Sequence, residues 1–559
     1  MSLSRVASME SYEHARGISP SREPRKMSFN PVETWVPPAA HEEPVGAFEV
    51  PKTKRLLQII VAVIYCIPAA GPVFGYAALK PVLVKEGVYH DRCPGAQVMD
   101  HLVSPGACYE QEIRMFTVAA VATNVCALPV GTILDRYGPR VSGLIGSVAI
   151  AIGAALFAFA GQFPFDGYIP GYFFLALGGP FVFISTFQLS NAFPTHSGLI
   201  LAILTGAFDS SSALFLVFRL VFEHTRGAFN IQKFFLAYLI VPVFIFVAQI
   251  FLMPKHSYKT MGELVKQAED SAFDEHESDE DMSDTSARLH MRDARRERRE
   301  SIVSEITSLL GPKGGDVHVR KEAHKNTISG VWGALHGRTA IQQIWTPWFW
   351  LVTLFTMVQM TRNNYFVATI RPQYTYLLHS YEDAKRINEI FDVALPVGGL
   401  VAIPMIGLVL DHTSTPFVLA VLVFFATLIG ILGIIGTTGA AYCNIILFVL
   451  YRPFYYTTVS DYASKVFGFA TFGKVYGLII CLSGFFNFSQ SALDAMTHKA
   501  FRGDPRPANI LLCVLALLVG LLLCSYVWHK SRNMKRELLE EEADGATESL
   551  MPGAGFGDL

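Results

Sequence analysis

Long apolar runs divide the chain into two groups of six, separated by a polar stretch. Each run is long enough to cross a bilayer as a helix, which takes roughly 20 residues. Backbone polar groups must be satisfied inside lipid, so the runs are predicted to be helices. The runs cover residues 56–79, 113–134, 141–161, 168–192, 197–222, 231–253, 346–370, 386–410, 416–437, 440–461, 467–492 and 507–528.

This pattern predicts an all-α polytopic membrane protein with twelve transmembrane helices in two six-helix halves. The predicted domains are a disordered N-terminal tail, an N-terminal half, a largely disordered central loop, a C-terminal half and a C-terminal tail. They span residues 1–55, 56–253, 254–345, 346–528 and 529–559.

Composition and charge placement agree with a membrane protein and suggest its orientation. The chain is 51% hydrophobic and 16% charged, whereas a soluble domain carries about a quarter charged residues. Lys54 and Arg55 precede the first run, and Lys530 and Arg532 follow the last. Positive residues near helix ends mark the cytoplasmic side, so both tails and the central loop are predicted to be cytoplasmic. The plasma or vacuolar membrane is favoured, and the mitochondrial inner membrane is left open.

A charged turn lies between the second and third runs and holds most of the charge there. It contains Gly131, Asp135, Arg136, Gly138 and Arg140. The glycine allows close approach of helices, and the aspartate can accept from amides at a helix N-terminus, where the helix dipole favours a carboxylate. The arginines can pair across the interface between the halves. We expect contacts that form when the cytoplasmic side closes and break when it opens.

A second, weaker copy of this turn occurs about 276 residues later, at Gly407 to His412, with Asp411 in the place of Asp135. It lacks both arginines, so the first copy is predicted to provide most of the latch. Shorter matches at similar offsets indicate an internal duplication. Parallel repeats of six helices place the substrate site between the halves near the midplane.

The turn, its echo and the twelve-run layout resemble the major facilitator superfamily. A narrower resemblance involves Gly206, Ser211 to Ala213, and Thr361 to Phe366. These stretches are similar to the fifth and seventh spans of solute carrier family 43, the system-L-type transporters of large neutral amino acids. The chain is identified as a divergent, fungal-type member. The resemblance implies a facilitator that moves neutral amino acids by alternating access.

Polar residues inside the apolar runs are the candidate substrate ligands, because burying them in lipid is costly unless they face a cavity or a partner. An arginine can hold a carboxylate in bidentate fashion, and an aspartate can hold an ammonium group. Asp209 and Arg362 could equally form a structural ion pair between helices. Arg452 lies in the tenth run, and Tyr65 and Tyr76 are candidates for the pocket wall. The predicted substrate residues are Asp209, Ser210, Arg362, Asn363, Asn364, Tyr365, Asn487 and Gln490.

Two other functions stay open at this stage. One is a proton-coupled carrier of another small metabolite, an organic anion or a nucleobase, on the same fold. The other is a non-transporting receptor or scaffold. The spans contain no metal motif and no nucleophile–base set, so we expect no enzyme, no cofactor and no metal. The expected partners are a small-molecule substrate and the lipid bilayer, and not nucleic acid.

Two predictions concern the loops. Cys93 and Cys108 lie in the first external loop, where they could form a disulfide or remain free thiols. The central loop has Ser278 and Ser283 in acidic surroundings, and a dileucine-type pattern begins at Glu305. These features suggest kinases or sorting adaptors as partners of the loop.

Overall fold

The computed structural model describes residues 50–89, 115, 118–258 and 328–550. Every regular element in these ranges is a helix. Cys93, Cys108 and the predicted sorting and phosphorylation sequences of the central loop lie outside the described residues. The six cysteines inside the described ranges are free thiols.

The helices of the N-terminal half coincide with the first six predicted runs. Proline and glycine interrupt several of them; the first run, for example, breaks after Ala69 and resumes at Pro72, next to Gly71. The segments are α2 (Lys52–Ala69), η2 (Pro72–Gly75), α3 (Tyr76–Lys85), α5 (Ala127–Ala158), α6 (Tyr168–Thr186), η5 (Phe187–Ala192), α7 (Ser197–Ser210), α8 (Ala213–His224), α9 (Ile231–Tyr238) and α10 (Ile240–Phe251).

The helices of the C-terminal half overlap the last six predicted runs, but the last helix continues past the predicted end at residue 528 to Leu550. A short helix, α14 (Ala340–Ile344), precedes them and begins with a capping box at Thr339. The remaining helices are α15 (Pro347–Leu378), α16 (Tyr381–Val401), α17 (Ile403–His412), α18 (Thr415–Leu432), α19 (Thr438–Phe467), α20 (Phe472–Phe486), α21 (Ser489–Lys499) and α22 (Arg506–Leu550).

Several helices differ from straight, uniformly apolar spans, either because they bend or because they carry buried polar residues. The second and third runs form one continuous stretch, Val118–Ala158, which bends at Gly138 with φ 83° and ψ 172°. Within the described ranges, six helical segments are long and apolar enough to cross a membrane, and the bent pair α16–α17 makes a seventh. Other runs, such as α15 and α19, carry many buried polar residues, as expected for helices that line the inside of a bundle.

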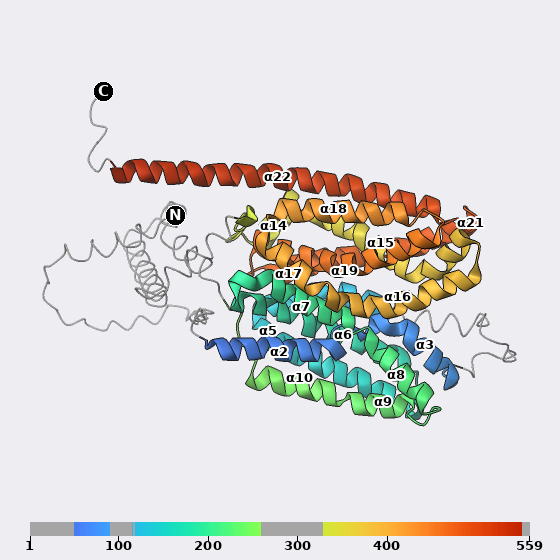
Figure 1. Ribbon diagram of the computed structural model, residues 1–559. Helices are drawn as coiled ribbons and strands as arrows, with labels where there is room; N and C mark the ends of the chain where they lie inside the picture. The colour runs from blue at the N-terminus through green and yellow to red at the C-terminus, as the bar shows by residue number, and fades with distance from the viewer. Residues whose placement is uncertain (1–49, 90–114, 116–117, 259–327, 551–559) are drawn as a thin grey trace, which may run out of the picture. The chain divides into compact units, whose positions relative to one another are not determined.

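Residues 45–529 form one compact unit, and the part of α22 from Lys530 onward belongs to a second. Within the first unit, the N-terminal helices, blue to green in Figure 1, meet the C-terminal helices, yellow to red, along a shared interface. This interface pairs α5 with α20, and α7 with α16, α17 and α19. The candidate site lies along these helices.

Candidate substrate site and latch

Asp135 of the charged turn caps a helix of the opposite half. Its Oδ1 accepts a hydrogen bond from the Gly473 amide at 2.8 Å, and its Oδ2 accepts from the Lys474 amide at 2.8 Å. Both amides belong to the first turn of α20, where backbone N–H groups lack intrahelical acceptors. The helix dipole adds to the attraction for a carboxylate. The contact expected from the sequence is therefore present, and it joins the two halves.

Asp411 makes the equivalent contact in the opposite direction. Its Oδ1 accepts from the Gly198 amide at 2.9 Å, and its Oδ2 accepts from the Leu199 amide at 3.1 Å. These amides lie in the first turn of α7, in the N-terminal half. Each half thus supplies one aspartate that caps a helix of the other. We call these four hydrogen bonds the latch, and their end of the bundle the latch end.

Glycines allow the helix backbones to touch beside the latch. A Cβ added at Gly131 would lie 1.8 Å from the Gly473 carbonyl oxygen, and one at Gly477 would lie 2.3 Å from that of Ala127. At the other contact, a Cβ added at Gly407 would lie 2.9 Å from the Leu199 Cα. No side chain fits at these distances without separating the helices, so the glycines are a steric condition for closure.

The arginines of the turn do not span the halves, which corrects the expectation drawn from their charge. Arg140 donates from Nε and Nη2 to the Met253 carbonyl, at 3.1 and 2.6 Å, within its own half. Arg136 is exposed and lies over the ring of Tyr137. The missing arginines of the second copy therefore do not weaken its contact with the other half. Each copy contributes two hydrogen bonds to the latch, so the prediction that the first copy provides most of the latch is not supported.

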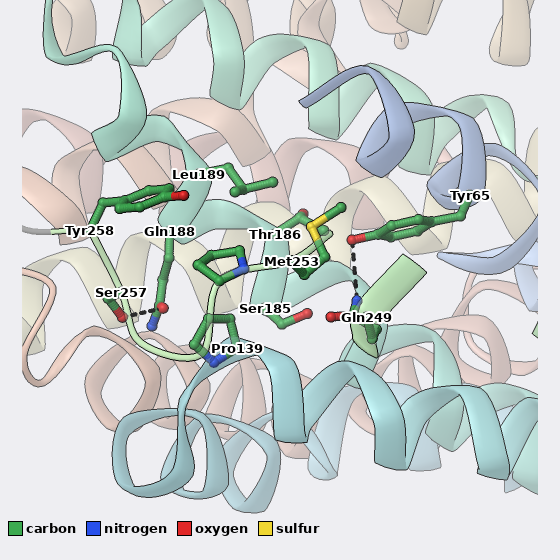
Figure 2. A pocket seen from close by; sticks show the side chains of 11 residues that line it. Tyr65, Pro139, Ser185, Thr186, Gln188, Leu189, Gln249, Met253, Ser257 and Tyr258 are labelled. Carbon is green, nitrogen blue, oxygen red and sulfur yellow. Dashed lines mark hydrogen bonds between the residues drawn. The ribbon is translucent and has the colours of Figure 1, made fainter. Parts of the chain in front are cut away.

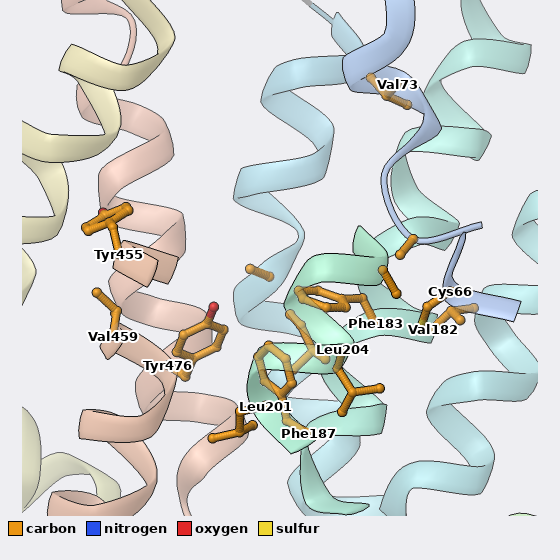
Figure 3. Close-up of a cluster of buried hydrophobic side chains, with 14 of the residues drawn as sticks. Cys66, Val73, Val182, Phe183, Phe187, Leu201, Leu204, Tyr455, Val459 and Tyr476 are labelled. Atoms are coloured by element: carbon orange, nitrogen blue, oxygen red, sulfur yellow. The ribbon is translucent and has the colours of Figure 1, made fainter. Parts of the chain in front are cut away.

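Aromatic side chains close the space between the latch and the middle of the bundle. The Phe187 ring of η5 contacts the Phe472 and Tyr476 rings of α20, with centroids 6.0 and 5.7 Å apart. Phe472 and Tyr476 stack on each other at 5.1 Å. Figure 3 shows Phe187, Leu201 and Leu204 of the N-terminal half and Val459 and Tyr476 of the C-terminal half in this cluster. We call the cluster of Phe187, Phe472 and Tyr476 the aromatic plug.

A cavity lies between the halves, next to the aromatic plug. Its empty volume is about 640 Å³, including the part that is open to solvent. Its walls are mainly aromatic and aliphatic, and its polar lining consists of Thr123, Asn124, Thr205, Arg452 and the hydroxyls of two tyrosines. Mostly apolar walls with a few polar groups are typical of small-molecule sites. The other lining residues are Phe74, Ala127, Pro180, Phe183, Ile184, Phe187, Phe208, Met360, Tyr456, Tyr476 and Ile480.

Arg452, which lines the cavity, forms an ion pair with Asp209 of the other half. Arg452 Nη1 of α19 donates to Asp209 Oδ1 of α7 at 2.8 Å, and the two side chains are 7% and 1% exposed. The Arg452 guanidinium also lies over the Tyr456 ring, 5.6 Å from its centroid. Asp209 Oδ2 is buried without a hydrogen-bond partner. Asp209 is therefore paired with Arg452, not with Arg362, which the sequence had suggested.

The other predicted substrate residues fall into two groups. Asn363 and Asn364 follow the cavity-lining Met360 by about one helical turn, and Asn487 follows Ile480 by about two. Gln490 is half-buried, one turn further along. These four residues lie farther from the latch than the cavity-lining residues of the same helices, and none of them is among the residues that line the cavity.

The second group faces other surroundings. Ser210 Oγ donates to the Gly206 carbonyl at 2.8 Å and to that of Pro396 at 3.3 Å, which packs α7 on α16. Tyr365 shares a hydrogen bond of 2.9 Å with Thr497 inside the C-terminal half. Arg362 lies against Gly430 of α18 in the same half.

Most of the cavity-lining residues were not predicted from the sequence. They include two threonines, one asparagine and several phenylalanines. Thr123, Asn124 and Thr205 look like ordinary helix residues in the sequence. The two proposed wall tyrosines lie elsewhere, because Tyr76 packs on Tyr172 and Tyr65 borders a different cavity. A signal was present only for Arg452, since a buried arginine in an apolar run needs a partner.

A smaller cavity, with about 270 Å³ of empty space, lies within the N-terminal half near the latch end. Figure 2 shows Tyr65 and Gln249 joined on one side of it, and Gln188 and Ser257 joined on the other. Its lining also includes Met253, whose carbonyl binds Arg140. Its lining residues belong to α2, α5, α6, η5, α10 and the segment after α10, so the cavity lies within the N-terminal half.

Comparison with known proteins places the chain in a family. A model described as Major Facilitator Superfamily matches residues 110–490. Protein FMP42 of Saccharomyces cerevisiae is 44% identical over 487 residues, which cover 85% of this chain and 95% of that protein. The chain belongs to the major facilitator superfamily and is a multi-pass membrane transporter of that family.

More distant relatives have names that state a cargo. The Equilibrative nucleobase transporter 1 of Bos taurus is 22% identical over 83% of this chain and 94% of its own length. The Large neutral amino acids transporter small subunit 3 of Mus musculus is 28% identical over 161 residues, 27% of this chain and 28% of that protein. The resemblance to large neutral amino acid transporters noted in the sequence is confirmed.

A solved structure shows the same fold. A double-tryptophan mutant of XylE superposes with a TM-score of 0.56 at 13% identity, covering 87% of this chain and 99% of that chain. This similarity confirms the predicted two-half, twelve-helix architecture.

Proposed function

We propose that this transporter moves neutral amino acids by alternating access, as a facilitator, with the substrate bound in the cavity between the halves. The observation that carries the proposal is Arg452, which lines an aromatic cavity and is paired with Asp209 of the other half. One negative and one positive group beside apolar walls complement a zwitterion with an apolar side chain. The relative named for large neutral amino acids supports the same cargo.

The ligand roles follow from the chemistry of each group. Arg452 has guanidinium nitrogens beyond the one bound to Asp209 and can hold the substrate carboxylate in bidentate fashion. Asp209 Oδ2, which has no hydrogen-bond partner, can accept from the substrate ammonium. Phe183, Phe208 and Tyr456 would surround the side chain. Asn363, Asn364 and Asn487 would meet the substrate on its way from the open side.

The latch supplies the conformational part of the proposal. We place Asp135 and Asp411 as the two gating residues on the cytoplasmic side, with Gly131 allowing closure and with Gly138 and Arg140 holding the turn against its own half. A Cβ at Gly138 would lie 2.2 Å from the Lys255 carbonyl oxygen, and its φ is 83°. With the latch made and the aromatic plug closed, the cavity faces the other side. The plasma or vacuolar membrane is the proposed location, with both termini cytoplasmic.

One observation favours a second candidate, the proton-coupled carriage of a nucleobase or organic anion. A buried carboxylate with one unpartnered oxygen, here Asp209, can accept a proton at that oxygen. The aromatic walls would also stack on a planar base, and one relative is named for nucleobases. The two candidates differ in what competes for uptake and in whether a proton gradient drives it.

Uptake into proteoliposomes tests both. The purified chain should take up radiolabelled leucine, and phenylalanine and methionine should compete, whereas adenine, uracil and dicarboxylates should not. Imposing a pH gradient should leave the steady-state level unchanged. If no large neutral amino acid competes or accumulates, the amino-acid assignment is wrong. If a proton gradient concentrates a base or an anion, the second candidate replaces it.

A further inference from the structure

Arg362 is a buried cation that lacks a counter-ion among the described residues. The buried charged side chains in these ranges are Arg55, Asp209, Arg362, Arg452, Asp461 and Lys465. Asp209 is paired with Arg452 at 2.8 Å, and Asp461 with Lys465 at 2.6 Å. Both buried carboxylates are therefore already neutralised by other cations.

The two remaining cations differ in their surroundings. Arg55 has a buried Nε without a partner, but it donates from Nη1 to the Ala192 carbonyl and lies over the Phe193 ring, so its charge is partly satisfied. Arg362 is 9% exposed, and its Nη1 is buried without a hydrogen-bond partner. A cation inside a membrane bundle is expensive unless it is paired or solvated. Arg362 thus needs a negative partner that the described residues do not supply.

A second unpartnered polar group faces the same place. Tyr451 of α19 interacts electrostatically with Arg362, and its buried hydroxyl has no hydrogen-bond partner. Cys513 of α22 is the other ionisable neighbour, and Gly430 of α18 lies against the guanidinium. A Cβ at Gly430 would lie 3.3 Å from Arg362 Nη2 and 2.3 Å from Cys513 Sγ. Phenol and thiol are ordinarily neutral near pH 7, so these neighbours leave the charge of Arg362 uncompensated.

This position is distinct from the substrate cavity. Met360 lines the cavity, and Arg362 lies two residues later, which turns its side chain about 200° around α15. Arg452 lines the cavity, and Tyr451 is about 100° away on α19. Neither Arg362 nor Tyr451 is among the residues that line the cavity, so a substrate held by Arg452 would lie against different faces of α15 and α19.

Further polar side chains lie on α15 between this position and the end of the bundle opposite the latch. Thr369 and Gln373 follow Arg362 by seven and eleven residues and lie on the same face of α15. Gln373 Nε2 donates to Thr369 Oγ1 at 2.6 Å, and Asn509 Nδ2 of α22 donates to Gln373 Oε1 at 3.0 Å. Gln373 is about 16 Å from Arg362 along the helix axis.

We infer that the C-terminal half binds one small monovalent anion, chloride, between the Arg362 guanidinium and the Tyr451 hydroxyl. The guanidinium and the hydroxyl can both donate hydrogen bonds to an anion. The guanidinium carries one positive charge, which a monovalent anion neutralises. The anion would stabilise the packing of α15, α18, α19 and α22 around Arg362. This inference does not depend on the proposed substrate, because the site lies outside the cavity.

The test measures chloride binding to the purified full-length chain after exchange into sodium gluconate. Equilibrium dialysis with radiolabelled chloride should find about one chloride per chain. The thermal unfolding midpoint should rise saturably, by a few degrees, when chloride replaces gluconate at constant ionic strength. Arg362→Gln should lose both effects. Arg371→Gln, which changes another arginine of α15 that stacks on Tyr381, should keep both.

A milder variant keeps the test valid should Arg362→Gln fail to fold. Tyr451→Phe retains the charge and removes one hydrogen bond to the anion, so it should weaken chloride binding about tenfold. Absence of bound chloride in the wild-type chain would refute the inference. Equal binding by wild type, Tyr451→Phe and Arg362→Gln would also refute it. If the wild-type chain binds chloride but does not take up leucine, the substrate proposal is wrong and the chloride site stands.

Discussion

Replacing either latch aspartate by asparagine should open the latch end to a similar degree. Asp135 and Asp411 each accept two backbone hydrogen bonds from the first turn of a helix in the other half. Asparagine keeps one acceptor oxygen and places an NH₂ group against the second amide. The sequence suggested unequal latches because the second copy lacks arginines, so equal effects are a sharp test of the observed contacts.

The magnitude follows from the lost interactions. A hydrogen bond to a charged group contributes about 1.5–3 kcal/mol, and a charge at a helix terminus contributes about 0.3–1 kcal/mol. Each substitution should thus destabilise the closed latch by about 2–4 kcal/mol. A change of 2 kcal/mol alters a population ratio about 30-fold. A closed state favoured about 100-fold would then be favoured only about threefold.

Spin labels on the two halves can measure this shift. Thr132 of α5 and Trp345, which follows α14, are exposed residues near the latch end. Electron–electron distance measurements on Thr132→Cys/Trp345→Cys protein should show one dominant short distance. Asp135→Asn and Asp411→Asn should each add a longer distance with comparable weight.

Arg136→Gln is the matched control, because Arg136 belongs to the same turn but is exposed and contacts Tyr137. It should leave the distance distribution unchanged. The reasoning fails if Asp411→Asn behaves like the wild type while Asp135→Asn opens the protein. It also fails if Arg136→Gln opens the latch as much as the aspartate variants do.

Two further predictions use the same end of the bundle. Gly131→Ala should reduce transport at least tenfold without unfolding the chain, because its Cβ would lie 1.8 Å from the Gly473 carbonyl oxygen; Gly439→Ala, which meets nothing within 4 Å, should transport normally. Normal uptake by Gly131→Ala would show that the observed closure is not part of the cycle. Arg140→Gln should lower the free energy of unfolding by about 2 kcal/mol, because the charged hydrogen bonds to the Met253 carbonyl are lost. An unchanged thermal unfolding midpoint would contradict that role.

The architecture could be predicted from the sequence because lipid imposes a simple rule. Any chain segment crossing it must be helical and mostly apolar, so twelve runs and a repeated Gly–Asp turn were enough to define two halves. The role of Asp135 as a helix cap was also predictable, because free backbone amides at a helix N-terminus bind a carboxylate favourably. That Asp411 does the same without arginines could not be predicted from charge counts.

The site was harder to predict, because periodicity does not reveal which helices of the two halves meet. Asp209 needed a cation, and Arg362 and Arg452 both lie in apolar runs. Only the packing of α7 against α19 shows that Arg452 is the partner. The hydroxyl and amide groups of Thr123, Asn124 and Thr205 carry no sequence signal that separates cavity lining from helix packing.

The central claim is that the cavity binds a zwitterion at the Asp209–Arg452 pair. Calorimetric binding of leucine, leucine amide and 4-methylpentanoate to the purified chain tests it most directly. Leucine amide lacks the carboxylate meant for Arg452, and 4-methylpentanoate lacks the ammonium group meant for Asp209. We predict that leucine binds and that each analogue binds at least tenfold more weakly, since each loses a charge-assisted contact. Equal affinity for all three ligands, or binding of adenine in place of leucine, would contradict the claim.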